Sequence, residues 1–217
     1  DRSLSERTFL LYYPRTQGGP HMLEKLSARL TEALLRRGAA EESKRELFEY
    51  GFQITLSTLL WLATITVIGL VFFDWRFLLC YLLFYLPVRQ FAGGYHCSTY
   101  GGCYALSCLM FLAVCLGGRA LQVPGWKLPV LALGALALLF IFWQAPVMNP
   151  SNPLSKRGIR KNRNSARLFV LLDGAGLLLL SLLGTGLILL SVSALTVFSV
   201  ACLMIAEKLA ERRRILQ

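Results

Sequence analysis

The uncharged stretch FQITLSTLLWLATITVIGLVFF, residues 52–73, decides the fold class of this chain. An α-helix of about 20 apolar residues crosses the hydrocarbon core of a bilayer. Every backbone amide and carbonyl inside lipid needs a hydrogen-bond partner in the protein, and a helix provides these partners within itself. The stretch therefore predicts one membrane-spanning helix.

The rest of the chain repeats this pattern, because 55% of its 217 residues are hydrophobic. Five further apolar stretches cover Phe77–Val88, Cys103–Gly118, Leu128–Met148, Leu168 to about Leu183, and Leu187–Ala206. We therefore predict an all-α integral membrane protein with about six transmembrane helices.

Two parts of this pattern differ from a plain membrane span. The stretch from 77 to 88 is short and ends beside Pro87, so it is interpreted equally as a tilted, broken or partly re-entrant helix. The last two stretches are nearly continuous, and only Gly184-Thr185-Gly186 indicates a tight hairpin between them.

Lys and Arg concentrate in three segments, at residues 25–45, in an expected loop at 155–167, and at 208–214. With six spans all three fall on one side, which the positive-inside rule identifies as the cytoplasm. We expect a multi-pass protein of the cell membrane with both termini cytoplasmic. The net charge of +11 then reflects topology and attraction to anionic lipid, and we expect no nucleic-acid partner.

The beginning of the chain contains two different segments. GGPHM at 18–22 looks like the remnant of a cleaved expression tag, so residues 1–21 are expected to be a leader and Met22 the natural start. Residues 22–50 are expected to be an amphipathic helical segment, followed by a six-span membrane domain at 51–217. One helical face of this segment carries Leu23, Leu26, Leu30 and Leu34. The helix lies either on the inner membrane surface or, solvated, packed on the loops.

The six cysteines predict neither disulfides nor a metal site. Four of them lie inside apolar runs, where a thiol behaves as a small hydrophobe: Cys80, Cys108, Cys115 and Cys202. His96, Cys97 and Cys103 would leave a zinc ion without a fourth ligand. No motif indicates a nucleotide or other cofactor, so none is expected.

The segment RQFAGGYHCSTYGGC, residues 89–103, interrupts the apolar runs at the cytoplasmic end of the second and third spans. Irregular backbone at that depth is tolerated only where it is buried in protein or lines a wet cavity, and such loops are usually functional. His96 and Cys103 would stand about 10 Å apart on a continuous helix, too far to interact. The glycine pairs on either side supply flexible backbone, so that the segment can turn and bring the imidazole to the thiol.

Cys103 is the preferred nucleophile of this segment. It lies where the next apolar run begins, so the helix dipole and a nearby imidazolium stabilise a thiolate. The backbone amides of Gly102, Cys103 and Tyr104 at the same terminus are candidates for an oxyanion hole. Cys97 is the rival nucleophile, but His96 reaches a residue across a turn more easily than its direct neighbour. On the residues alone, a packing role for the pair stays open.

Two polar residues near the membrane boundary are further candidates. Asp173 lies inside the fifth span, where an ionisable residue is a functional candidate by default. It either orients His96 as a third catalytic member or pairs with Arg167 or Arg163. Gln144 lies at a similar depth and is an alternative in the orienting role.

The motif resembles a known family. Arg89, then Gly93-Gly94-Tyr95-His96, then Cys103 resemble the signature of the AgrB family, the accessory gene regulator B peptidases of Gram-positive quorum sensing. The segment APVMNPSNPLSKR from Ala145 is similar to the family's proline-containing exit from the fourth span. The basic residues from 156 to 163 are spread among Gly, Ile and Asn where the family has a tight lysine run.

The resemblance implies residue roles. His96 would be the general base and Cys103 the nucleophile, with Arg89 and Gly94 in supporting roles. Arg89 is equally suited to anchor the end of the second span to lipid phosphate.

The resemblance also implies a function. A membrane-embedded cysteine endopeptidase would cleave the C-terminal part of an AgrD-type precursor through an acyl-enzyme thioester and promote (thio)lactone cyclisation of the autoinducing peptide. Its partners would be the precursor and the bilayer, and a homodimer is compatible with the sequence. The alternatives are a small membrane transporter or exporter and a non-catalytic membrane scaffold. The almost wholly apolar midplane disfavours a transporter.

Overall fold

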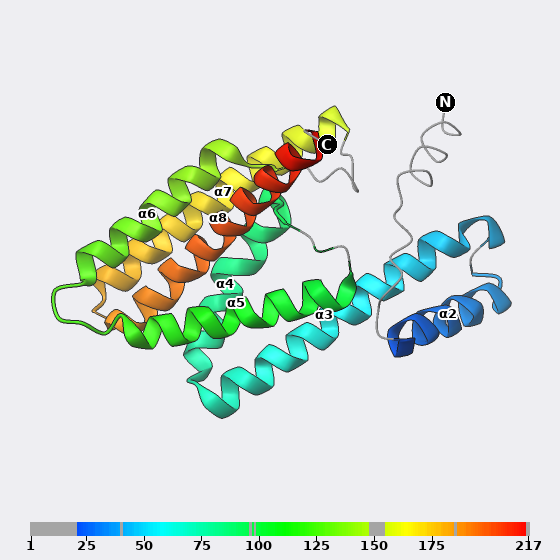
Figure 1. The fold of residues 1–217 in the computed structure, drawn as a ribbon, viewed down its shortest axis with the longest axis horizontal. Coiled ribbons are helices and arrows are strands. Elements are labelled where there is room, and N and C mark those ends of the chain that lie inside the picture. Colours follow the sequence, from blue (N-terminus) through cyan, green and yellow to red (C-terminus); the bar gives the residue numbers. More distant parts are fainter. Residues whose placement is uncertain are drawn as a thin grey trace. The chain divides into compact units, whose positions relative to one another are not determined.

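The computed structural model describes residues 21–39, 41–95, 97, 99–147, 155–184 and 186–215, and within these ranges every regular element is a helix (Figure 1). The helices are α2 (His21–Arg36), the short 3-10 helix η1 (Glu42–Lys44), α3 (Arg45–Phe72), α4 (Trp75–Ala92), α5 (Tyr100–Ala120), α6 (Lys127–Gln144), α7 (Lys156–Leu182) and α8 (Leu187–Ile215). The predicted all-α class is confirmed.

Five of these helices, α3, α5, α6, α7 and α8, are long and apolar enough to cross a membrane. The sixth expected span is α4, whose 18 residues include the charged Arg76 and Arg89. α4 continues past Pro87 as one helix, so the broken alternative is wrong. Length and composition confirm an integral membrane protein, and the status of α4 as a full span stays a prediction.

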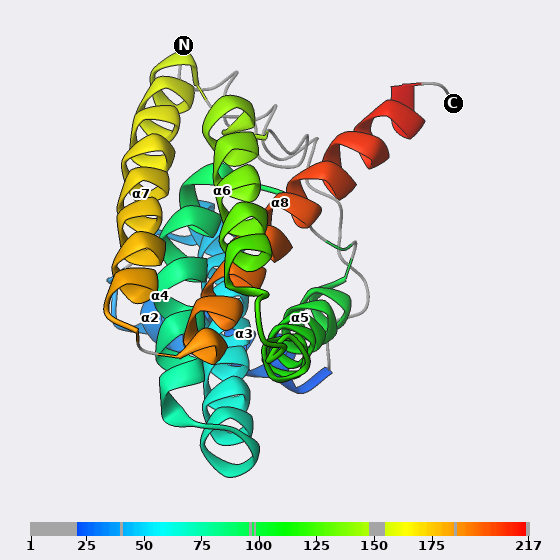
Figure 2. The ribbon, with the colours of Figure 1, turned by 90° about the vertical axis from the view of Figure 1, so that its left-hand side faces the viewer.

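The helices form two compact units, and each is described by itself. The α8 unit contains residues 69–95 and the described residues from 110 to 215. In it α8 packs against α4, α6 and α7, and α7 also contacts α4 and α6 (Figures 1 and 2). The apolar window of α8 is 72% buried, against 28% or less for the other four candidate spans. α8 is therefore the central helix of this unit.

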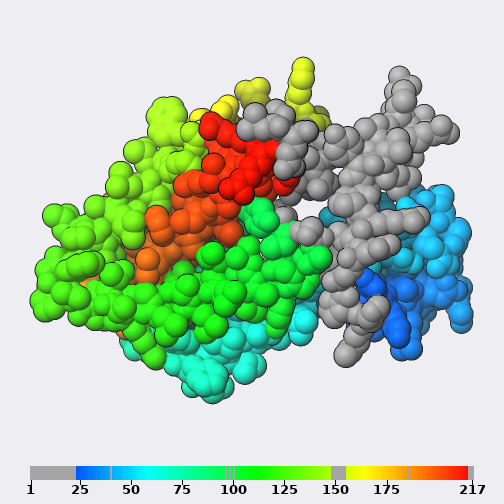
Figure 3. Space-filling model, viewed as in Figure 1, coloured from blue at the N-terminus to red at the C-terminus, as the bar shows by residue number. Residues whose placement is uncertain are grey.

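Small side chains allow the close packing of α8. Its fully buried residues include Ser191, Val192, Ser193, Ala194, Thr196 and Val197, and small residues of this kind let membrane helices approach each other. Gly134 of α6 lies against Ala194, because an added Cβ would stand 3.2 Å from the Cβ of Ala194. The space-filling view shows α6 and α8 in contact along one face (Figure 3).

The predicted hairpin joins α7 and α8. α7 ends at Leu182 and α8 begins at Leu187. Between them Gly184 and Gly186 have φ angles of 62° and 95°, which glycine adopts without steric cost. The hairpin is confirmed, with Thr185 outside the described residues.

The basic segment at 155–167 is helical, whereas the sequence predicted a loop. The Ser155 side chain accepts a hydrogen bond from the N–H of Gly158 at 3.1 Å and so caps α7. α7 then runs without interruption into the apolar stretch from Leu168. Its first turns expose Lys156, Arg157, Arg160, Lys161 and Arg163. The loop prediction failed because a polar pattern indicates exposure to solvent, and a capped helix can be exposed as well.

The α2 unit contains the described residues from 21 to 68, Cys97, and residues 99–109. Within it Glu32 of α2 pairs with Arg36 at 3.1 Å and with Arg45, the first residue of α3, at 2.9 Å. The hydrogen bonds from these guanidinium groups, Arg45 foremost, lower the pKa of Glu32. The domain boundaries expected at residues 21 and 50 stay predictions.

The buried positions of α2 are not its leucines. Ser27 and Thr31 are fully buried, and their hydroxyls donate to the carbonyls of Glu24 and Ser27. Leu26 and Leu30 keep 40% and 37% of their surface exposed. These leucines suit a face turned to lipid, and the choice between a membrane-surface helix and a solvated one stays a prediction.

We expect Gly118→Ala to destabilise the α8 unit. A Cβ at Gly118 would lie 2.5 Å from Cγ2 of Val192, and a valine in a helix is held to one strongly preferred rotamer. Overpacking of this kind costs about 1–3 kcal/mol. The measurement is thermal unfolding of the purified protein in detergent micelles.

Gly51→Ala is the matched control for this substitution. Nothing lies within 4 Å of a Cβ added at Gly51, and the gain in helix propensity makes that variant neutral or more stable. A Gly118→Ala protein that melts at the same temperature as the Gly51→Ala protein would contradict the expected packing.

Candidate active site

Backbone contacts with Val147 hold the motif segment in place where α4 ends. Val147, just after the end of α6, donates its N–H to the carbonyl of Ala92 at 2.8 Å, and Gly93 forms an isolated parallel bridge with Val147. Gly93 has a φ of 75°, and a Cβ there would lie 2.3 Å from the carbonyl oxygen of Val147. Only glycine fits this position.

A second anchor fixes Tyr95. Its N–H donates to the carbonyl of Leu203 in α8 at 2.9 Å, and its own carbonyl accepts from Nη2 of Arg89 at 2.8 Å. Gly94 has a φ of 130°, and a Cβ there would stand 2.8 Å from Nη1 of Arg89. Arg89 therefore has a partner in the motif backbone, in addition to any contact with lipid phosphate.

These contacts correct the role expected for the glycine pairs. The sequence predicted that they supply flexible backbone. Gly93 and Gly94 instead combine a positive φ with a close approach of neighbouring atoms, so they hold one conformation. Gly101 and Gly102 lie inside the first turn of α5, where they form part of a regular helix.

The first turn of α5 contains Cys103, as predicted. Thr99 caps this helix, because its Oγ1 accepts from the N–H of Gly102 at 3.1 Å and its carbonyl accepts from the N–H of Cys103 at 3.1 Å. Two of the three amides expected to form an oxyanion hole are therefore already occupied. That expectation is wrong for Gly102 and Cys103, and an oxyanion here needs other donors.

The sulfur of Cys103 lies beside the backbone of Cys97. The N–H of Cys97 donates to Sγ of Cys103 at 3.1 Å, and the thiol of Cys103 faces the carbonyl of Cys97 at 3.9 Å. Both side chains are half-buried. Burial, followed by the neighbouring Cys103, raises the pKa of the Cys97 thiol. Burial thus disfavours the ionised form of the Cys97 thiol.

Two of the other predicted site residues lie in the α8 unit, and the predicted base His96 is outside the described residues. Asp173 is 7% exposed in α7, and its Oδ2 has no hydrogen-bond partner within the part of the chain that the structure describes. It forms no ion pair with Arg167, whose guanidinium lies over the ring of Phe142 at 4.9 Å. Gln144 is exposed at the end of α6 and accepts a hydrogen bond from Lys208 of α8.

Sequence reasoning missed Glu207. This residue of α8 is fully buried, with one carboxylate oxygen 3.3 Å from Nη2 of Arg214 and with Oε2 unpartnered among the described residues. Glu207 comes one helical turn after Leu203, whose carbonyl holds Tyr95. The signal was available in the sequence, because an acidic residue near the end of an apolar helix is a functional candidate.

Sequence reasoning also missed a hydrogen bond that supports the first turn of α5, which contains Cys103. The hydroxyl of Tyr104 lies 2.9 Å from Oγ1 of Thr64 in α3. Because the Thr64 hydroxyl donates to the carbonyl of Leu60 at 2.9 Å, Tyr104 is the donor. Within the α2 unit this bond ties the start of α5 to α3.

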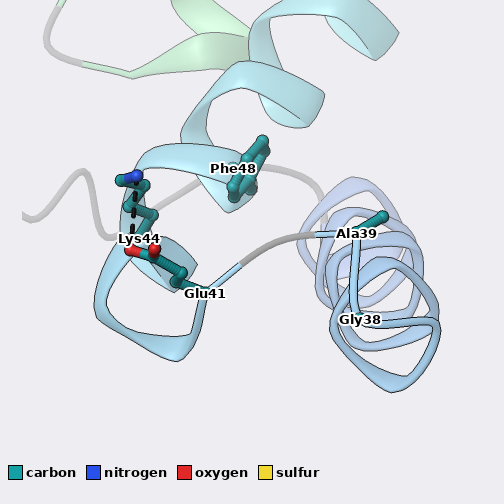
Figure 4. A pocket seen from close by; sticks show the side chains of 5 residues that line it. All are labelled: Gly38, Ala39, Glu41, Lys44 and Phe48. Atoms are coloured by element: carbon teal, nitrogen blue, oxygen red, sulfur yellow. Dashed lines mark ion pairs between the residues drawn. The ribbon is translucent and has the colours of Figure 1, made fainter.

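A surface pocket at the connection from α2 to α3 is separate from these residues. It is lined by Gly38, Ala39, Glu41, Lys44 and Phe48, with an ion pair of 3.3 Å between Glu41 and Lys44 (Figure 4). None of the described motif residues lines it. Among the residues that the structure describes, no group of three or more His, Cys, Asp or Glu side chains is placed to hold a metal ion.

A comparison of the chain with known protein families finds a match. The family model of AgrB, accessory gene regulator B, matches residues 26–206. The chain belongs to the AgrB family. No curated protein and no solved structure matches it. The AgrB family takes part in quorum sensing, in which it processes a signal peptide from the AgrD precursor, and the apolar helices place the chain among membrane proteins.

We expect Gly94→Ala to lower precursor processing about tenfold or more, because a non-glycine residue held at a strained φ costs of order 1–3 kcal/mol. The added Cβ would also meet Nη1 of Arg89 at 2.8 Å and disturb the bond that holds Tyr95. The measurement is conversion of a synthetic AgrD-type precursor by the protein in vesicles, followed by mass spectrometry.

Gly101→Ala is the control, because no described atom lies within 4 Å of its added Cβ and its backbone is helical. If the Gly94→Ala protein converts precursor as fast as the Gly101→Ala protein, the close contact with Arg89 does not matter for processing.

Proposed function

We propose that this member of the AgrB family is a membrane-embedded cysteine endopeptidase that cleaves the C-terminal part of an AgrD-type precursor and promotes its cyclisation. The observation that carries the proposal is the place of Cys103 in the first turn of α5, with its sulfur beside the N–H of Cys97. A helix N-terminus and a backbone donor both favour an anionic sulfur.

In the proposed first step His96 takes the proton of Cys103, and the thiolate attacks a peptide carbonyl of the precursor. A carbon–sulfur bond forms and the carbon–nitrogen bond breaks. The C-terminal fragment leaves as an amine that takes the proton back from His96. An acyl-enzyme thioester on Cys103 remains.

In the second step an internal cysteine of the precursor attacks the thioester carbonyl. The new ring is a thiolactone, and Cys103 leaves as a thiolate that recovers its proton. Exchange of one thioester for another is nearly isoenergetic, so the ring forms only if water is kept from the acyl-enzyme. An internal serine would give a lactone by the same route.

The anchored backbone beside His96 supports this mechanism. Tyr95, the residue before it, is bound on one side by Arg89 and on the other by Leu203. Anchoring of the residue before a general base favours efficient catalysis, because less freedom is lost when the base acts. This is the positioning role that we assign to Arg89 and Gly94.

Two buried carboxylates are candidates for the residue that orients His96. Asp173 was expected from the sequence, and it is buried with no described partner for Oδ2. We favour Glu207, because it lies one turn from Leu203, to which Tyr95 is bonded, and because its Oε2 also lacks a partner among the described residues. A buried carboxylate facing the distal ring nitrogen would hold the imidazole in the tautomer that accepts the thiol proton.

The basic surface at the start of α7 is the proposed docking region for the precursor. Exposed Lys and Arg side chains cover the first turns of α7, and Arg212, Arg213 and Arg214 are exposed at the end of α8. Such a surface attracts an acidic peptide tail or anionic lipid. It belongs on the cytoplasmic side, with both termini, in the cell membrane of a Gram-positive host. A homodimer stays a prediction.

The acyl-enzyme gives the direct test of the nucleophile. After incubation with precursor, we expect the wild type and Cys97→Ala to carry a hydroxylamine-labile adduct with the mass of the precursor's N-terminal fragment. Cys103→Ala and His96→Ala should carry none, because one lacks the nucleophile and the other its base. The measurement is intact-protein mass spectrometry.

Cys97→Ala is the matched control in this test, because it keeps the backbone N–H that faces Cys103. A Cys103→Ala protein that still cleaves and cyclises the precursor would refute the assignment. Undiminished signalling by that variant without any cleavage would point to a transporter or a scaffold.

The orienting carboxylate has its own test. We expect Glu207→Gln to lower kcat about tenfold or more and to shift the pH dependence of kcat/KM, because a catalytic imidazole loses its charged partner. Asp173→Asn should change both quantities less. Glu207→Asp should recover part of the activity, since the charge is kept. A pH profile that is identical in Glu207→Gln and the wild type would exclude the role.

A further inference from the structure

Cys97 and Cys103 form a thiol pair that the proposed reaction does not use as a pair. The N–H of Cys97 donates to Sγ of Cys103 at 3.1 Å, and the same sulfur lies 3.9 Å from the carbonyl of Cys97. The proposed peptidase needs only one of the two thiols. The second thiol therefore has no assigned role, although its residue contacts the sulfur of Cys103 through the backbone.

Gly102 makes this arrangement sterically feasible. A Cβ on Gly102 would lie 3.1 Å from Cβ of Cys97 and 3.5 Å from its Sγ. Both distances are at or below ordinary van der Waals contact, so a side chain at this position would push Cys97 away from the helix. The absence of a side chain at Gly102 lets Cys97 lie against the first turn of α5.

Cys97 differs from the other five cysteines, because all of them, Cys103 included, lie within helices. Cys80, Cys108, Cys115 and Cys202 lie within α4, α5 and α8. Cys97 instead precedes α5, so a movement of its side chain breaks no hydrogen bond of that helix. Both members of the pair are half-buried rather than enclosed, so a small oxidant has access to them.

We propose that Cys97 is a resolving cysteine, and that hydrogen peroxide converts Cys97 and Cys103 into an intramolecular disulfide. The Cys103 thiolate attacks the peroxide, the oxygen–oxygen bond breaks, and a sulfenic acid and hydroxide form. The thiol of Cys97 then attacks the sulfenic sulfur, and water leaves as the sulfur–sulfur bond forms. The two thiols lose two electrons in total, and the peroxide gains them.

This inference rests on the proposed function for its biological consequence, because a disulfide at Cys103 removes the nucleophile. The modification is reversible, since an external dithiol reduces the bond by thiol–disulfide exchange. Without a resolving partner the sulfenic acid proceeds to sulfinic and sulfonic acids, which dithiols do not reduce. Cys97 would therefore protect the site and stop signal production under oxidative stress. The raised pKa of Cys97 fits the resolving member of the pair, which does not attack first.

The test treats the full-length protein in lipid nanodiscs with hydrogen peroxide, blocks free thiols and maps the peptides by mass spectrometry. We expect a loss of about 2 Da, the mass of two hydrogen atoms, and one cross-linked species joining the peptides that contain Cys97 and Cys103. Dithiothreitol should remove both signals. Cys202→Ala is the matched control and should form the same cross-link, whereas Cys97→Ala should accumulate sulfinic acid on Cys103.

Precursor processing is measured on the same samples. Oxidised wild type should lose processing about tenfold or more and regain it with dithiothreitol, whereas Cys97→Ala should lose it permanently. A wild type that gives sulfinic acid or intermolecular disulfides as its main product would overturn the proposal. The cross-link is detected by mass spectrometry, without a measurement of activity. Its absence would refute the resolving role of Cys97. Precursor processing by Cys103→Ala would refute only the peptidase assignment.

Discussion

Backbone hydrogen bonding away from water is the constraint on which the motif segment depends. After α4 residues 93–95 leave helical structure, and an unpaired amide or carbonyl that is buried costs several kcal/mol. The carbonyl of Ala92 accepts from the N–H of Val147. The N–H of Tyr95 donates to the carbonyl of Leu203, and the carbonyl of Tyr95 accepts from Arg89. The segment keeps its irregular form because α8 and the residues after α6 supply these partners. A substitution in α8 or in the residues after α6 would therefore disturb the motif segment without replacing a motif residue.

The glycines of the motif follow from the same constraint. A backbone that bonds to two distant segments must approach them closely, and at Gly93 the carbonyl of Val147 occupies the space of a Cβ. At Gly94 the guanidinium of Arg89 does the same. Glycine is required here for space and for positive φ, so the pair restricts the conformation of the segment. This reasoning also explains why an arginine that bonds to Tyr95 occurs at the end of α4.

Much of the fold could be predicted from the sequence, because hydrophobic length alone identifies membrane helices. The hairpin at Gly184 and Gly186 and the start of α5 near Cys103 were also predictable from local signals. Long-range contacts were not, since no local pattern indicates that Leu203 receives the N–H of Tyr95. Threonine is a preferred N-cap residue, so Thr99 at the start of α5 could have been predicted as a cap. Because Thr99 accepts from the amides of Gly102 and Cys103, the expectation that these amides are free is wrong. Glu207 was overlooked because it lies close to the basic end of α8.

The environment of Cys103 has to meet two conflicting requirements if this residue is the nucleophile. A sulfur that attacks a peptide carbonyl needs donors that favour its anion and a path for the substrate, and the same features expose it to oxidants. The N–H of Cys97 supplies such a donor, and it belongs to the residue to which we assign the resolving thiol. Gly102 lets this residue approach. If both proposals hold, a single close contact between a loop residue and a helix terminus supports the nucleophile when it is reduced and shields it when it is oxidised.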